Sequence, residues 1–313
     1  MYAGYGLLID SELPLPDLPT RAADPAATAR ADVVVRIGPV APPGPGALRL
    51  PRGLWVDGDR VGIDVPGVAR YSCVQGARIT VEPAADATPD ALRLFLLGSA
   101  LSCLLTQRGL LVLHGNAFVV DKAAAVVLGH SGAGKSTLAA EMHRRGHVVL
   151  SDDVVPVDAT GHALPGWPRI KLWRDALDRL GVAADGLRRV DEAFDKFHVP
   201  LDRTASPAPV PVRWVYVLDR HDGPLRVVPL TGASAFASLH EHSYRNEILV
   251  GVLRRTHLVR CADLVRRTWI ARVDRPPGVD SVGSSADAIL TDIAEHREER
   301  PHDPSRASHA VDA

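Results

Sequence analysis

The chain has 313 residues, of which 46% are hydrophobic and 23% are charged, and its formal net charge is -1 at pH 7. This length can bury a full core in one large domain or two smaller ones, and the composition is that of an ordinary soluble protein. The charge is balanced and the arginines are scattered among acids without a basic stripe, so neither nucleic acid nor a membrane is expected as a partner.

The N-terminal residues lack the basic start of a secretory signal, because acids and prolines follow within a few positions. The longest apolar stretch, residues 92–105, is interrupted by Arg93, Gly98, Ser99 and Ser102. We expect it to be too short to span a bilayer. The cytoplasm is therefore the expected location.

Residues 1–86 carry short β-like runs, separated by connections rich in proline and glycine. The runs are 6–9, 33–37, 54–56, 60–63 and 79–81. They predict a small β-rich N-terminal domain over residues 1–86.

A long helix is expected next, at the start of a second domain over residues 87–296. Thr88 suits the N-cap, Pro89 the first position and Asp90 the first turn of this helix. Gly109 is expected to stop it after about residue 107.

The following segment predicts strands and a helix around a glycine-rich loop. In chain order these are strands at 110–113, 117–120 and 123–128, the loop at 129–137, a helix at 138–145 and a strand at 147–150. Further strands are expected at 154–157, 169–172, 212–218 and 226–229, further helices at 233–239, 262–265 and 284–296, and a disordered polar tail at 297–313.

The loop has the pattern G-x-x-x-x-G-K-[ST], with Gly129, Gly134, Lys135 and Ser136 at its fixed positions. Glycines let backbone N–H groups curl around a polyphosphate, the lysine reaches the β- and γ-phosphates, and the serine hydroxyl can ligate Mg²⁺. A glycine-rich turn without a ligand is the plainer alternative. The expected nucleotide-binding residues are Gly129, Ser131, Gly132, Ala133, Gly134, Lys135, Ser136 and Thr137.

Two adjacent carboxylates, Asp152 and Asp153, follow the next predicted strand. Successive strand residues face opposite sides, so only a bend lets both approach the nucleotide. One would then hold Mg²⁺ while the other accepts a proton from an attacking hydroxyl. The alternative is one magnesium ligand and one solvated or capping aspartate. His114, at a strand end in the same sheet, would orient a carboxylate or is a satisfied core histidine.

Lysine is scarce, since only Lys122, Lys135, Lys171 and Lys196 occur among the 36 basic residues. Lys196 and Arg245 are candidate cations for the γ-phosphate or for an acidic group of a substrate. A solvated surface position is the alternative for both.

Together these motifs resemble the catalytic core of HPr kinase/phosphorylase, and still more the HPr-kinase-like serine kinases found beside peptide-modifying genes in bacteria, including lasso-peptide clusters. The similarity rests on Leu113-His114-Gly115-Asn116, the loop 129–137, Arg145-Gly146-His147 and Ser151-Asp152-Asp153, with weaker similarity at Tyr5-Gly6-Leu7, residues 165–173 and Asp195-Lys196.

The resemblance implies an α/β fold: a P-loop kinase core of the HPr kinase or phosphoenolpyruvate-carboxykinase type with a mixed sheet, beside the small β-rich domain. It implies ATP and Mg²⁺ as cofactors and a catalytic partnership of His114 with Asp152. The chain departs from HPr kinases at Thr137, where they place an acidic residue, and their Pro-Gly-Arg-Asn segment has at most a distant relic in Tyr244-Arg245-Asn246. HPr as substrate, phosphorolysis and the hexameric assembly therefore do not carry over, and a homo-oligomer stays open.

The sequence thus predicts an ATP-dependent kinase for a serine hydroxyl of a peptide or small protein, such as a lasso-type (RiPP) precursor. Asp152, oriented by His114, would take the proton, and Lys135 would contact the phosphates. Ser136 and Asp153 would position Mg²⁺. The alternatives are a kinase for free serine or another small hydroxyl compound, an ATPase, and a non-catalytic nucleotide-sensing module.

Overall fold

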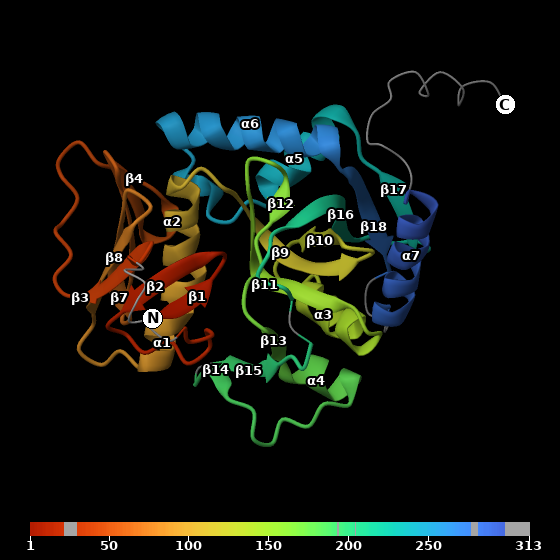
Figure 1. Ribbon diagram of the computed structural model, residues 1–313, viewed down its shortest axis with the longest axis horizontal. Helices are drawn as coiled ribbons and strands as arrows, with labels where there is room; N and C mark the ends of the chain where they lie inside the picture. The colour runs from red at the N-terminus through yellow and green to blue at the C-terminus, as the bar shows by residue number, and fades with distance from the viewer. Residues whose placement is uncertain (22–29, 193, 204, 277–280, 298–313) are drawn as a thin grey trace.

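The computed structural model describes residues 1–21, 30–192, 194–203, 205–276 and 281–297, and within these ranges the strands form three sheets. An N-terminal sheet with its helix lies at the left of Figure 1, and a central mixed sheet lies at the right. A small third sheet lies below them in the same view. The architecture is therefore mixed α/β. Except for Arg297, the tail predicted at 297–313 lies outside the described residues.

The N-terminal sheet is built from residues 2–83. In pairing order it contains β1 (Tyr2–Gly4), β2 (Leu7–Ser11), β3 (Val33–Ile37), β8 (Arg78–Pro83), β7 (Ala69–Val74), β6 (Arg60–Val65), β5 (Leu54–Asp57) and β4 (Leu48–Arg49), with a short turn η1 (Pro51–Gly53) before β5. The strand predicted at 33–37 agrees with β3 residue for residue. Strands β1, β4 and β7 were not predicted from the sequence, because they are short or interrupted by polar residues.

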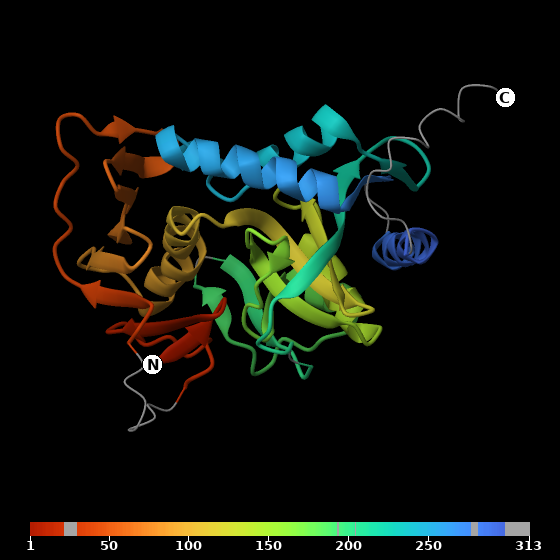
Figure 2. The ribbon, with the colours of Figure 1, turned by 45° about the horizontal axis from the view of Figure 1, so that its top comes forward.

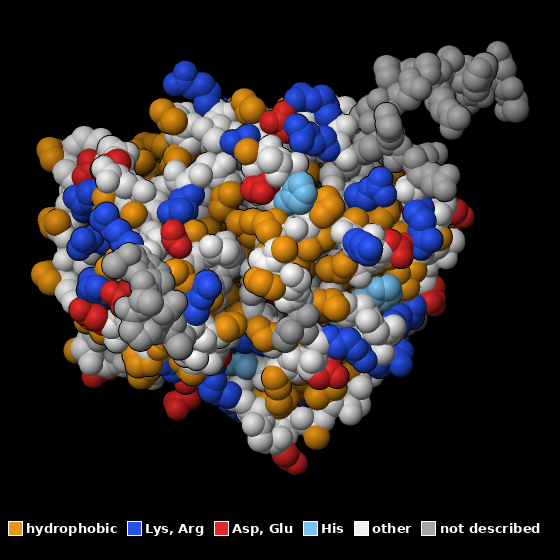
Figure 3. Space-filling view, in the orientation of Figure 1, with side chains coloured by type: hydrophobic (Ala, Val, Ile, Leu, Met, Phe, Trp, Pro, Cys, Tyr) orange, Lys and Arg blue, Asp and Glu red, His pale blue; other side chains and the backbone are white. Residues whose placement is uncertain are grey.

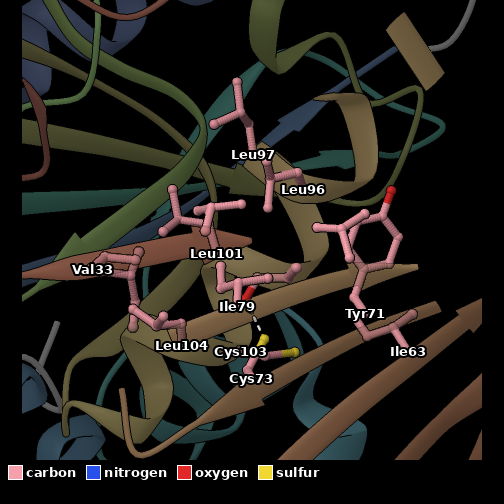
Figure 4. Packing of buried hydrophobic residues seen from close by; sticks show 14 of the residues in the cluster. Val33, Ile63, Tyr71, Cys73, Ile79, Leu96, Leu97, Leu101, Cys103 and Leu104 are labelled. Atoms are coloured by element: carbon pink, nitrogen blue, oxygen red, sulfur yellow. Dashed lines mark hydrogen bonds between the residues drawn. The ribbon is translucent and has the colours of Figure 1, made fainter. Parts of the chain in front are cut away.

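A long helix packs against this sheet, in the order α1 (Pro89–Phe95), a π-helical turn η2 (Leu96–Ala100) and α2 (Leu101–Gln107). It starts as predicted, because the Thr88 hydroxyl accepts a hydrogen bond from the Ala91 N–H at 3.1 Å. Figure 4 shows leucines of this helix against Ile63, Tyr71 and Ile79 of the sheet. The helix expected to open the second domain thus shares the core of the N-terminal sheet.

By length and composition alone, the same helix, Pro89–Gln107, is the one among the described residues that could cross a membrane. It has 19 residues, so the expectation that this stretch is too short does not hold. Within the molecule 67% of its apolar window is buried, and helices in protein cores pass the same test. Packing against the sheet therefore accounts for its apolar character.

The central sheet brings parallel and antiparallel strands together. In pairing order it contains β10 (Ala123–Gly129), β9 (Leu111–Val120), β11 (Val148–Val157), β12 (His162–Ala163), β16 (Val210–Arg220), β18 (Trp269–Arg275) and β17 (Arg226–Pro229), and β10 also pairs with β16. Strands β10, β16 and β18 run parallel, so their C-terminal ends meet at one edge. β9 and β11 are each continuous, although the sequence predicted each of them as two short strands.

Helices cover both faces of the central sheet. α3 (Lys135–Arg144) and α7 (Val282–Glu295) pack on one face, where Leu138, Met142 and Ile289 are buried. α5 (Gly232–Glu241) and α6 (Gly251–Arg267) pack on the other face, with Leu239 and Leu264 in the core. Figure 2 shows α6 lying across the molecule from the N-terminal sheet to the central sheet, and a short turn η3 (Asn246–Ile248) precedes it. The helix predicted at 262–265 is therefore much longer.

The small sheet joins α3 to the N-terminal part of the molecule. In pairing order it contains β13 (Arg169–Trp173), β15 (Phe194–Pro200) and β14 (Arg189–Asp191). The helix α4 (Arg174–Leu180) follows β13 directly in the chain. Ile170, Leu172 and Phe197 pack with Ala139 of α3 in one buried cluster. Only β13 was predicted. On the face in Figure 3, the Lys and Arg side chains of the described residues are interspersed with Asp and Glu.

Candidate functional site

The glycine-rich loop joins β10 to α3 at the edge of the central sheet, in the order strand, loop, helix. Gly134 has a φ of 83° immediately before α3, in the left-handed region that glycine adopts without strain. Lys135 folds back over the loop, where its ammonium group donates to the carbonyl oxygens of Gly129 at 2.6 Å and His130 at 3.0 Å. The ammonium group of Lys135 and the N-terminus of α3 therefore lie together at the loop, as in phosphate-binding sites.

An open cleft with a volume of about 650 Å³ lies beside the loop. Binding pockets for small molecules commonly measure roughly 300–1,000 Å³, so the cleft has room for a nucleotide. Of the predicted site residues, the cleft is lined by His114, Ser131, Gly132, Gly134, Lys135, Ser136, Thr137, Asp152, Asp153 and Lys196. Gly129, Ala133 and Arg245 are not among its lining residues.

A bulge in β11 brings both aspartates to this cleft. The register of β11 against β9 shifts between Val149 and Ser151, and Asp153 has a φ of 73°. Residues other than glycine are uncommon in this left-handed region, and such strained conformations cluster at functional sites. Both carboxylates line the cleft, so the bend that two nucleotide-facing aspartates require is present.

The contacts of the two aspartates differ from the predicted pairing. Asp152 accepts a hydrogen bond from Ser136 Oγ at 3.0 Å and another from the Lys171 backbone N–H at 2.9 Å. Asp153 Oδ1 lies 3.4 Å from His114 Nε2, and Asp153 Oδ2 lies 2.5 Å from Lys171 Nζ. The structure thus places His114 beside Asp153 rather than Asp152. It places Ser136 beside Asp152 rather than Asp153.

His114 reaches the cleft from within β9. The sequence predicted it at the end of a strand, but β9 continues through it and runs antiparallel to β10. Leu128 of β10 pairs with Gly115, so His114 lies level with the start of the loop. Asp153 of β11 also pairs with Gly115, so this aspartate and His114 occupy neighbouring positions on adjacent strands. The ring of Tyr244 lies 5.1 Å from the imidazole, centre to centre.

The N-terminal sheet supports the bulge through Tyr5. The Tyr5 hydroxyl donates to the carbonyl oxygen of Val154 at 3.1 Å, and Ser151 Oγ donates to the same oxygen at 2.6 Å. Tyr5 is only 2% exposed. These two hydrogen bonds fix the backbone directly after the aspartates, so a residue far away in the sequence helps to position the site.

The charged side chains of the cleft shift one another's pKa values. Burial raises the pKa of the Asp153 carboxyl, but the charges of Lys171 and His114 outweigh it and hold that pKa well below its usual range. Asp153 is therefore ionised at neutral pH. Burial lowers the pKa of Lys135, against the opposing effect of the aspartates. Burial and then the charge of Lys171 lower the pKa of Lys196. Three of the four lysines of the chain line this cleft.

The two cations predicted to assist the site lie in different places. Lys196 of β15 lines the cleft, with its ammonium group 5.5 Å from the centre of the Trp173 ring. Arg245 does not reach the cleft, because its Nη2 donates to Ser99 Oγ in the π-helical turn at 2.6 Å. Arg245 thus ties the long helix to the segment before α6.

Three arginines that line the cleft were not predicted as site residues: Arg179, Arg220 and Arg275. Arg220 ends β16 and donates to the carbonyl oxygen of Gly132 at 3.2 Å. Arg275 ends β18 and donates to the carbonyl oxygen of Ala133. A signal was available in the sequence, because two apolar runs end in the same Asp-Arg pair, at 219–220 and 274–275. Parallel strands place such ends at one edge, where α/β proteins bind their ligands.

The residues around the loop fit a nucleoside triphosphate and Mg²⁺. Mg²⁺ prefers hard oxygen ligands, and a hydroxyl and a carboxylate meet at Ser136 and Asp152. Lys135, Arg220 and Arg275 provide positive charge around the loop, as a polyphosphate requires.

No protein-family model matches the chain, and no curated protein matches it. Among solved structures, the chain is similar to the Hpr(Ser) kinase/phosphatase from Coxiella burnetii, with 13% sequence identity and a TM-score of 0.28. The similarity covers 59% of this chain and 98% of that chain. A TM-score this low does not establish a common fold, so the function of the site has to follow from its own residues.

Proposed function

We propose that the protein is an ATP-dependent kinase that transfers the γ-phosphate to a serine hydroxyl of a peptide or small protein. The position of Asp153 carries the proposal: this carboxylate lies between His114 and Lys171, in a cleft beside a phosphate-type loop. A general base must lie within reach of the hydroxyl that attacks the nucleotide. A lasso-type precursor peptide is one acceptor of this kind, as the motif resemblance implies.

In the proposed reaction the loop and the N-terminus of α3 hold the triphosphate. Ser136 and Asp152 would hold Mg²⁺, which offsets charge on the β- and γ-phosphates when it is bound. The serine oxygen attacks the γ-phosphorus in line, the bond to the bridging oxygen breaks, and ADP leaves. The hydroxyl proton passes to Asp153, which His114 and Lys171 hold in place. The two aspartates thus exchange the roles that the sequence predicted for them.

The proposal is tested by an intact-mass assay with Mg-ATP and three kinds of acceptor: serine-containing peptides, free serine and HPr. We expect one peptide to gain a phosphate, and we expect Lys135→Ala to abolish this gain because the loop loses its phosphate-binding cation. Lys122→Ala, in the exposed turn between β9 and β10, is the matched control. Hydrolysis of ATP without a phosphorylated acceptor would instead indicate an ATPase, and nucleotide binding without turnover would indicate a sensing module.

Arg220→Ala is expected to weaken ATP binding by about tenfold, because the cleft loses a cation that contacts the loop. Titration calorimetry with ATP at low and high salt measures the effect, which should shrink as salt screens this exposed charge. Arg213→Ala is the control, since Arg213 is an exposed residue of the same strand outside the cleft. Equal affinities for ATP in both variants would contradict a role for Arg220.

A further inference from the structure

The small sheet, which lies below α3 in Figure 1, has two unlike faces. Leu172 and Phe197 belong to the buried cluster that packs on α3. Successive residues of a strand point to opposite faces, so Lys171, Trp173 and Lys196 belong to the other face. All three of these residues line the open cleft beside the glycine-rich loop. The small sheet therefore forms a wall of this cleft.

Lys196 lies on this wall close to the proposed base. In the register of β13 and β15, Lys196 pairs with Trp173, and Lys171 pairs with His198. Lys196 and Lys171 are therefore diagonal neighbours on one face of the sheet, a separation that long side chains can bridge. The ammonium group of Lys171 contacts Asp153, the base of the proposed reaction. Lys196 is thus next to the point at which the phosphoryl group is transferred.

The ammonium group of Lys196 has no hydrogen bond or ion pair with any residue that the structure describes. Its contact is with the ring of Trp173, 5.5 Å away, which is a cation–π distance. In contrast, Lys171 is paired with Asp153, and Lys135 donates to two carbonyl oxygens. Burial lowers the pKa of Lys196, so its charge is partly removed from water. An anionic ligand would offset this cost.

The cleft as a whole carries an excess of positive charge. Among the described residues its lining includes the three carboxylates of Asp152, Asp153 and Asp175. Against these stand six cationic side chains, those of Lys135, Lys171, Arg179, Lys196, Arg220 and Arg275. Burial lowers the pKa of Lys135 most, and the charge of Lys196 lowers it further, so the two ammonium groups repel each other. An anion bound between the loop and the small sheet would remove this repulsion.

We propose that Lys196 is a catalytic residue that binds the γ-phosphate of the nucleotide from the side opposite the glycine-rich loop. This inference rests on the proposed kinase function. The lysine of a phosphate loop reaches the β- and γ-phosphates, which puts the γ-phosphate between Lys135 and Lys196. The ammonium group of Lys196 exchanges the ring of Trp173 for phosphate oxygens, which are stronger partners. The charge of the transferring phosphoryl group is then offset from both sides.

Lys196→Met tests the inference, because methionine keeps an unbranched apolar side chain and removes the charge. Titration calorimetry with Mg²⁺ compares ADP with a non-hydrolysable ATP analogue. We expect the variant to bind the analogue about tenfold more weakly and to keep its affinity for ADP within about twofold, since ADP has no γ-phosphate. Lys196→Arg should regain part of the lost affinity. Lys122→Met, in the exposed turn between β9 and β10, should keep both affinities.

The rate of phosphoryl transfer is the second measurement. In single-turnover phosphorylation at saturating Mg-ATP, Lys196→Met should be about 10²–10³-fold slower, the usual loss when one stabilising donor is removed. An equal loss of affinity for ADP and for the analogue would overturn the inference. An effect confined to the KM of the acceptor would also overturn it, because Lys196 would then bind the acceptor. Lys196→Gln carries the same measurements if Lys196→Met does not fold.

The two proposals fail in different ways. A selective loss of affinity for the analogue, in a protein that phosphorylates no acceptor, would keep Lys196 as a ligand of the γ-phosphate and contradict the kinase. Phosphorylation at the wild-type rate in Lys196→Met would keep the kinase and contradict the role of Lys196.

Discussion

Asp153→Asn is expected to lower the rate of phosphoryl transfer by about 10²–10⁴-fold, the usual contribution of a general base. Asparagine keeps the shape of the side chain and can still accept a hydrogen bond, but it cannot take the proton of the acceptor hydroxyl. ATP binding should change little, because Ser136 and Asp152 contact each other and not this carboxylate. The rate is measured by single-turnover phosphorylation at saturating Mg-ATP.

Asp152→Asn is the matched comparison, because the neighbouring carboxylate is lost with the same change in chemistry. Its main effect should be a higher Mg²⁺ concentration at half-maximal rate, since Ser136 loses its charged neighbour. If Asp152→Asn costs more rate than Asp153→Asn at saturating Mg²⁺, the pairing predicted from the sequence is the correct one. The geometry in which His114 contacts Asp153 would then not be the catalytic one.

Stability has to be checked in parallel, because the fold depresses the pKa of Asp153. An aspartate with a depressed pKa contributes stability that is present above its unfolded value, about 3.9, and is lost as the pH falls through the folded value. Asp153→Asn removes this contribution at neutral pH. Thermal unfolding at pH 7 must therefore show that the variant is folded at the assay temperature.

The sequence predicted a structural feature correctly where that feature depends on residues next to it in the chain. Thr88 caps the long helix as expected, since a cap depends only on residues next to it. The continuity of β9 and β11 was missed, because His114 and the aspartates look like chain breaks in a one-dimensional pattern. In the structure these polar residues stay in strands because β9 and β11 pair through them, His114 with Val154, Asp152 with Asn116 and Asp153 with Gly115.

The same distinction applies to the candidate site. The loop residues could be predicted because their function depends on contiguous backbone and one lysine. Arg220 and Arg275 lie far from the loop in the sequence, and only the parallel pairing of β10, β16 and β18 brings them to it. Lys196 and Arg245 looked alike as isolated cations, yet only Lys196 reaches the cleft. Which aspartate meets His114 depended on a bulge that sequence patterns do not reveal.

Gly115→Ala is expected to destabilise the protein by about 1–3 kcal/mol or more, as overpacking of a tight core does. A Cβ atom at this position would lie 2.3 Å from the carbonyl oxygen of Val127 and 2.9 Å from Leu128 Cδ2. The nearest obstacle is backbone, so no flexible side chain can move aside. Relief requires β9 to separate from β10, the strand that leads into the glycine-rich loop.

The matched control is Gly38→Ala, because a Cβ atom there meets no atom within 4 Å and the backbone is not left-handed. Its free energy of unfolding should stay within about 0.5 kcal/mol of the wild type, as for most surface changes. Denaturant unfolding of both variants measures the difference. If Gly115→Ala is as stable as Gly38→Ala, the close approach of β9 to β10 is absent in solution. His114 would then not be held at the start of the loop, and its contact with Asp153 would lose its structural basis.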